Sequence, residues 1–245
     1  MDLVTISENV LRDCLGAKAG EEVLIVTDDT RVSIAQALYE GAKNLGCEAM
    51  MTVMKERKLN GEEPPKAVAE AMKAADIVIC PTAKSLTHTN ARIQAVAAGT
   101  RVATMPGITE EMFSQGAMTA DYSAVAELTA KITEMLTECQ TARIEKDGCV
   151  LTLNLEGRKG VPSPGVYREA GQSGNLPSGE AYIAPLEDGV NGEMIIDGSM
   201  VGIGKLDAPL KVVIRDGKLQ KIEGDKDGKL EVLLANERNA TVGEL

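Results

Sequence analysis

The chain has 245 residues, of which 44% are hydrophobic, so it can form one large or two small domains with a buried core. Its formal net charge is −11 and no cluster of Lys and Arg is interleaved with aromatic residues, which argues against nucleic acid or an anionic membrane as a partner. No apolar run approaches the ~18 residues of a spanning helix, and no signal-peptide pattern follows the first Met, so we expect a cytoplasmic protein. The five cysteines stand singly, which is typical of reduced core thiols rather than disulfides or a zinc site.

Apolar runs alternate with helical patterns over the first 140 residues. The sequence predicts strands over 23–26, 49–54, 76–80 and 101–105, and most of these runs are apolar without interruption, as in strands buried on both faces. Helices are predicted from Thr5, where Thr5 and Glu8 match a capping box, and over 30–46, 64–75, 89–99 and 121–140. This alternation predicts an α/β domain with a doubly wound parallel sheet over residues 1–141.

The pattern changes after residue 141. Residues 142–155 and 210–222 each predict a hairpin, because each has alternating strands around an Asp-Gly turn. We therefore expect a β-rich domain over residues 142–245. Between the hairpins, residues 157–179 are rich in Gly, Pro and Ser and are expected to form a functional loop. The loop ends at Glu180, which we expect to be a partly buried carboxylate at the start of a short strand.

Two short segments carry a family resemblance. Residues 175–180 read Asn-Leu-Pro-Ser-Gly-Glu and residues 239–245 read Asn-Ala-Thr-Val-Gly-Glu-Leu. They resemble the two segments that carry metal-binding glutamates in the aminopeptidase T family of metallo-aminopeptidases. The resemblance implies Glu180 and Glu244 as ligands of two divalent metal ions, which would be zinc, cobalt or manganese. Which glutamate bridges the metals, or acts as a base, stays open.

The same resemblance implies a function and an assembly. It implies a hydrolase in which a metal-bound water releases leucine-type residues from a peptide substrate with a free N-terminus, and it implies a homodimer. The remaining metal ligands of the aminopeptidase T family are expected beyond Leu245. The β-rich catalytic domain is therefore interpreted as incomplete and the chain as a C-terminally truncated enzyme.

Two alternatives remain. Ring-cleaving iron dioxygenases that act on dihydroxypyridine resemble this same scaffold, and an α/β module that only dimerises or binds a ligand would need no metal site. The single histidine, His88, follows the third predicted strand, where open α/β sheets often bind ligands. We favour the simpler interpretation, in which His88 and Thr89 help to cap the next helix, and assign His88 no catalytic role. A dinucleotide site is not supported, because the turn after the first strand, containing Asp28 and Asp29, lacks GxGxxG and is interpreted as a helix cap.

Overall fold

The computed structural model describes residues 2–200, 203–225, 228–235 and 240–245. It contains two compact units, each made of two stretches of chain. Unit 1 comprises Met1–Thr129 and Ser163–Glu180, and unit 2 comprises Ala130–Pro162 and Ala181–Leu245. A domain boundary near residue 141 stays a prediction.

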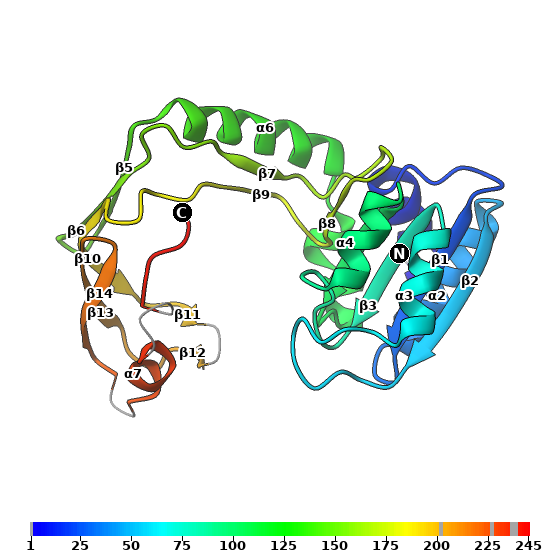
Figure 1. The fold of residues 1–245 in the computed structure, drawn as a ribbon, viewed down its shortest axis with the longest axis horizontal. Coiled ribbons are helices and arrows are strands. Elements are labelled where there is room, and N and C mark those ends of the chain that lie inside the picture. Colours follow the sequence, from blue (N-terminus) through cyan, green and yellow to red (C-terminus); the bar gives the residue numbers. More distant parts are fainter. Residues whose placement is uncertain (1, 201–202, 226–227, 236–239) are drawn as a thin grey trace. The chain divides into compact units, whose positions relative to one another are not determined.

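Unit 1 is built on a parallel sheet with strand order β2-β1-β3-β4-β8 (Figure 1). The strands are β1 (Glu22–Asp28), β2 (Glu48–Met54), β3 (Ile77–Thr82), β4 (Arg101–Pro106) and β8 (Ser173–Asn175). The helices are α1 (Leu3–Asn9), the π-helix η1 (Val10–Cys14), α2 (Val32–Asn44), α3 (Lys66–Ala74), α4 (Asn90–Ala97), α5 (Glu110–Ser114), the 3-10 helix η2 (Gly116–Thr119) and α6 (Tyr122–Glu138), of which α6 continues into unit 2. The predicted doubly wound α/β fold is confirmed.

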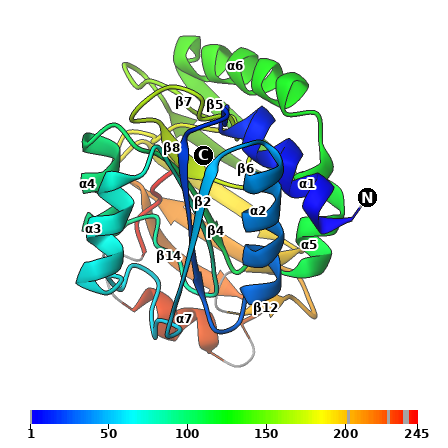
Figure 2. The same ribbon diagram turned by 90° about the vertical axis from the view of Figure 1, so that its right-hand side faces the viewer.

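Helices cover both faces of this sheet. Figure 2 shows α1 and α2 on one side of the strands and α3 and α4 on the other. Along β1, Val23 and Ile25 belong to the buried cluster under α1 and α2, whereas Leu24 and Val26 belong to the cluster under α3 and α4. Because side chains alternate between the two faces of a strand, a continuous apolar run is what a sheet covered on both sides requires.

Two predictions at the edges of unit 1 are wrong. The first helix begins at Leu3 rather than at a capping box formed by Thr5, because the Asp2 side chain accepts a hydrogen bond from the Thr5 amide at 2.9 Å. The expected loop over residues 157–179 also contributes a fifth strand, β8, which pairs with β4 from Val102 to Thr104. No apolar run marks β8, since its three residues are Ser, Gly and Asn.

Unit 2 is mainly an antiparallel sheet with strand order β14-β13-β10-β6-β5. Its strands are β5 (Thr141–Lys146), β6 (Cys149–Asn154), β10 (Val190–Ile196), β13 (Leu210–Arg215) and β14 (Lys218–Glu223). Smaller elements are β11 (Ser199–Met200), β12 (Gly204–Lys205) and α7 (Lys229–Leu234), while β7 (Val161–Ser163) pairs with β9 (Glu180–Tyr182). Both predicted hairpins are confirmed: Asp147 and Asp216 each have φ of 48°, followed by glycines with positive φ.

Several large apolar side chains at helical spacing along α6 are exposed. Leu128, Ile132 and Met135 have exposed fractions of 59%, 42% and 63%. The helical spacing was interpreted correctly, but amphipathic spacing does not say what covers the apolar face. No helix among the described residues is long and apolar enough to cross a membrane.

The cysteines should differ sharply in reactivity. All five are free; Cys139 is exposed and the others are buried. Burial raises the pKa of the Cys14 and Cys80 thiols from 9.0 to about 12, so neither forms a thiolate near neutral pH. We expect one fast-reacting thiol per native chain with Ellman's reagent at pH 8, and its loss in Cys139→Ser. Fast reaction persisting in that variant would contradict this assignment.

The same raised pKa values predict alkaline destabilisation. An unfolded thiol ionises near 9.0, while the folded Cys14 and Cys80 hold their protons to about 12. The contribution of these two thiols to the free energy of unfolding is therefore fully present below pH 9. It falls between pH 9 and 12 by about 1.4 kcal/mol per pH unit for each group. Urea titrations across this pH range should show a shallower fall in Cys80→Ala.

Candidate functional site

The carboxyl ends of the parallel strands in unit 1 bring several polar segments together. β1 and β3 are neighbours, but β2 lies on one side of β1 and β4 on the other side of β3, so the strand order reverses between β1 and β3. Open α/β sheets bind ligands at such a switch point. Asp28 ends β1 there and is 1% exposed.

Asp28 connects two strand ends rather than capping a helix. Its Oδ1 accepts from the Thr30 amide at 2.9 Å, and its Oδ2 accepts from the Ala83 amide, just after β3, at 2.6 Å. The helix α2 starts two residues later than predicted, and no side chain caps it. The prediction that the acidic turn caps this helix is therefore wrong, and the buried carboxylate instead holds the β1 and β3 ends together.

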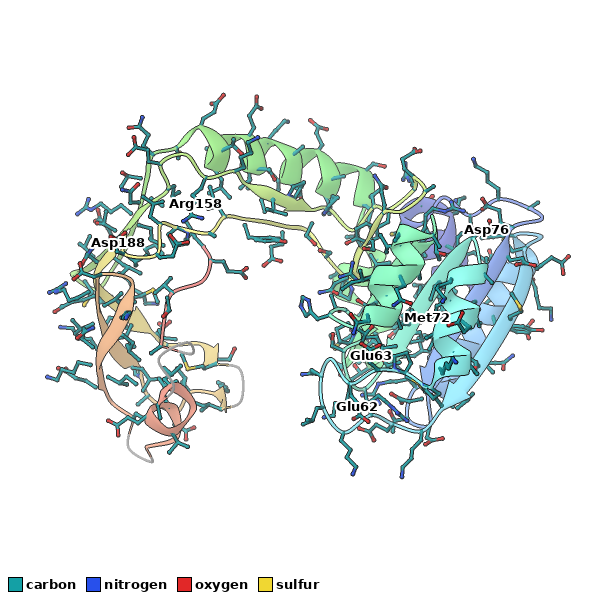
Figure 3. The ribbon with its side chains drawn as sticks, in the orientation of Figure 1. Glu62, Glu63, Met72, Asp76, Arg158 and Asp188 are labelled. Carbon is teal, nitrogen blue, oxygen red and sulfur yellow. The ribbon has the colours of Figure 1, made fainter. Side chains whose placement is uncertain are left out.

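The segment with His88 lies between β3 and α4. Thr89 caps α4, since its hydroxyl accepts from the Arg92 amide at 3.3 Å, and the His88 side chain is exposed. Glu63, labelled in Figure 3, accepts from the amides of Asn90 and Ala91 at 2.6 and 3.1 Å. The first amides of α4 thus donate hydrogen bonds to protein side chains, and the capping interpretation of Thr89 is confirmed.

Three side chains from separate segments form a group that we call the triangle: Thr87, Thr104 and Asn175. Both threonine hydroxyls donate to Asn175 Oδ1, at 3.0 and 2.8 Å, and the two hydroxyl oxygens lie 2.8 Å apart. The Ser85 hydroxyl donates to Thr87 Oγ1 at 2.9 Å. The end of β4, the end of β8 and the His88 segment are therefore linked by one network.

The chain from Asn175 to Glu180 is held by its backbone and by buried neighbours. The Leu176 amide donates to the Thr104 carbonyl at 2.9 Å, and the Ser178 hydroxyl donates to the Ser163 carbonyl at 2.7 Å. Leu176 is 1% exposed. Glu180 itself is exposed, although it is the first residue of β9, which pairs with β7. The expected partial burial of this carboxylate is wrong, because the burial of the loop ends before the glutamate.

Two buried tyrosines contact the chain between residues 165 and 175. Tyr167 donates its hydroxyl to the Asn175 carbonyl at 2.9 Å, and a Cβ at Gly174 would overlap that hydroxyl. The Tyr122 ring lies against Gly165, where a side chain would overlap the ring and where φ is +72°. Burial raises the pKa of Tyr122 to about 12 and that of Tyr167 above its usual value, so both stay neutral. Tyr167 acts as a donor, whereas the buried Tyr122 hydroxyl has no hydrogen-bond partner among the described residues and its ring serves for packing.

The segment with Glu244 is joined to the chain just after β9. Ile183 and Leu245 exchange two backbone hydrogen bonds, of 3.0 and 2.9 Å, and the Val242 amide donates to the Gly217 carbonyl at 2.9 Å. Glu244 is exposed. The first residue of the matching segment, Asn239, lies outside the described residues. The segment with Glu244 therefore pairs, within unit 2, with the residues that follow β9.

The described residues do not form a complete metal centre. Among residues 2–200, 203–225, 228–235 and 240–245, no group of three or more His, Cys, Asp or Glu side chains could hold a metal ion. A stable site for a divalent ion generally wants at least three protein ligands. The role of Glu180 and Glu244 as metal ligands therefore stays a prediction.

A family profile decides between the enzyme classes. The profile described as NicX, 2,5-dihydroxypyridine 5,6-dioxygenase, matches residues 2–237. The chain belongs to the 2,5-dihydroxypyridine 5,6-dioxygenase family. The members of this family are enzymes, so the prediction that the chain is an enzyme is confirmed. The aminopeptidase T assignment is wrong, and with it the hydrolase activity and the peptide substrate.

Solved structures show the same scaffold in both classes. A 2,5-dihydroxypyridine dioxygenase from Pseudomonas putida KT2440 has 16% identity and a TM-score of 0.77, with 99% of this chain and 74% of that chain covered. AmpT from Thermus thermophilus has 19% identity and a TM-score of 0.68, with 99% and 76% covered. At such identities these likenesses show the fold alone. No curated protein sequence matched the chain.

Two features of the candidate site could not be predicted from the sequence: the link that Asp28 makes between strand ends, and the triangle. Thr87 and Thr104 lie 17 residues apart, and Asn175 lies 71 residues beyond Thr104. Threonine and asparagine carry no motif at such separations. Asn175 belongs to the segment with Glu180, and Thr87 directly precedes His88, but neither pattern predicts their contact.

Proposed function

We propose that the chain is a ring-cleaving dioxygenase whose substrate is 2,5-dihydroxypyridine or a closely related dihydroxylated pyridine. The observation that carries the proposal is the family match over residues 2–237, and the fold shared with the Pseudomonas putida dioxygenase supports it. In this reaction the C5–C6 ring bond breaks and each of the two carbons gains one atom of O2. The ring supplies the electrons, so no external reductant is consumed.

We infer iron as the metal in place of the zinc, cobalt or manganese pair first expected. Iron supplies redox chemistry for O2, which zinc lacks, and mononuclear oxygenase sites typically use two histidines and one carboxylate. The described residues include one histidine and no cluster of three donors, so they do not fit this ligand set. The proposal therefore rests on family and fold and assigns no step to a metal held by these residues. A homodimer is likewise a proposal, which sedimentation analysis would test.

Oxygen uptake tests the proposed function directly. The whole protein as its gene encodes it, purified and supplied with ferrous iron and 2,5-dihydroxypyridine, should consume one O2 per ring, with loss of the aromatic absorbance. With 18O2, both labelled atoms should appear in the ring-opened product. Iron-free protein, denatured protein and an anaerobic sample serve as controls, and leucyl-peptide hydrolysis should stay at background. If iron-loaded protein shows no pyridine-dependent oxygen uptake, the proposal is wrong.

A further inference from the structure

In the triangle of Thr87, Thr104 and Asn175, the Thr104 hydroxyl has two hydrogen-bond partners among the described residues, and both are side chains from outside β4. Thr104 is 2% exposed, and the partners of its hydroxyl among the described residues are Thr87 and Asn175. A buried hydroxyl that loses its partners is destabilised unless another group replaces them. If both Thr87 and Asn175 moved away from β4, the Thr104 hydroxyl would lose both of these partners.

A second connection runs between the same two segments. Arg92 donates from Nε to the Thr87 carbonyl at 2.8 Å and from Nη1 to the Ser173 hydroxyl at 3.1 Å. Ser173 begins β8, and Asn175 ends it. Arg92 has no carboxylate partner among the described residues, so its guanidinium serves these neutral acceptors. Two independent links thus tie the segment before α4 to β8.

The backbone continues this connection toward Glu180. Asn175 offers its side chain to the triangle and its carbonyl to Tyr167, and the next amide, that of Leu176, bonds to the Thr104 carbonyl. Every one of these residues belongs to unit 1. The position of Asn175 is therefore fixed on both sides of its peptide group.

We infer that Thr87, Thr104 and Asn175 are positioning residues, which hold the His88 segment and the segment leading to Glu180 as one rigid edge during catalysis. The inference rests on the proposed dioxygenase function. Rigid placement of groups around a substrate can change rates by orders of magnitude, because small displacements are costly to turnover. The triangle supplies such placement at the edge where α/β sheets bind ligands.

The test compares two variants at Thr104 in β4 with one at Thr100, the residue before the strand. Thr104→Val keeps the shape and removes the hydroxyl, Thr104→Ser keeps the hydroxyl, and Thr100→Val is the matched control. Thr100 is also 2% exposed and its hydroxyl bonds to the carbonyls of Met72 and Ala75, at the opposite end of the strand. Because the chain has a single histidine, the imidazole proton signal of His88 in NMR reports on its segment alone.

We expect Thr104→Val to shift the His88 signal, to speed amide hydrogen exchange in residues 176–180, and to lower kcat about tenfold at little-changed KM. Thr104→Ser should restore all three, and Thr100→Val should leave them unchanged. A His88 signal and exchange rates unaffected by Thr104→Val would overturn the inference. So would equal effects of Thr100→Val, which would indicate general loosening of the sheet. If wild-type protein cleaves no ring, the proposed function falls, while the NMR and exchange measurements still decide whether the triangle couples the segments.

Discussion

Replacing Phe113 by alanine is expected to lower the free energy of unfolding by about 3–5 kcal/mol. Phe113 is the only phenylalanine in a chain without tryptophan, and it is fully buried in the cluster of unit 1 that contains α1, α2 and α5. The rest of that cluster is mainly aliphatic, and Tyr122 and Tyr167 are its other buried rings. Urea denaturation followed by circular dichroism measures the loss.

The neighbouring Met112 provides the control for this measurement. It lies in the same helix, α5, and is 46% exposed, so Met112→Ala should change the free energy of unfolding by no more than about 0.5 kcal/mol. Both variants remove a large side chain from the same helix, and only one opens a cavity. A loss below about 1 kcal/mol in Phe113→Ala would show that the core around α5 collapses easily or is loosely packed.

The sequence predicted those elements whose signal is local. Residues 23–26 and 76–80 could be recognised because a strand covered on both faces needs apolar residues at every position. The hairpin turns could be recognised because Asp147 and Asp216 precede glycines that accept positive φ. β8 could not, since Ser173, Gly174 and Asn175 form a strand only through pairing with β4. Which side chains of α6 are covered likewise depends on tertiary contacts, which the helical spacing does not reveal.

Two short segments predicted the scaffold but not the reaction. The short segments around Glu180 and Glu244 were recognised as belonging to a known scaffold, and structures of both a dioxygenase and AmpT share that scaffold. Such segments report on the fold and not on the reaction, so choosing the aminopeptidase from them was wrong. The family profile uses residues 2–237 together and therefore separates the two classes.

A second large effect is expected at the switch point of the sheet. Asp28→Asn should lower the free energy of unfolding by about 2–3 kcal/mol, in the range of hydrogen bonds to a charged group. One carboxylate oxygen accepts from the amide and hydroxyl of Thr30 and the other from the amide of Ala83. An asparagine keeps one acceptor and turns its NH2 toward an N–H donor on the other side, so one contact becomes repulsive.

Asp29→Asn is the matched control for Asp28→Asn. Asp29 is the next residue and is exposed, so its variant removes the same charge from the same turn with an expected change within about 0.5 kcal/mol. The difference between the two variants isolates the link between the ends of β1 and β3 from a general charge effect. Because Ala83 leads into the His88 segment, amide exchange at residues 83–88 should rise in Asp28→Asn alone. Equal stability of the two variants would mean that the carboxylate of Asp28 does not hold the strand ends together.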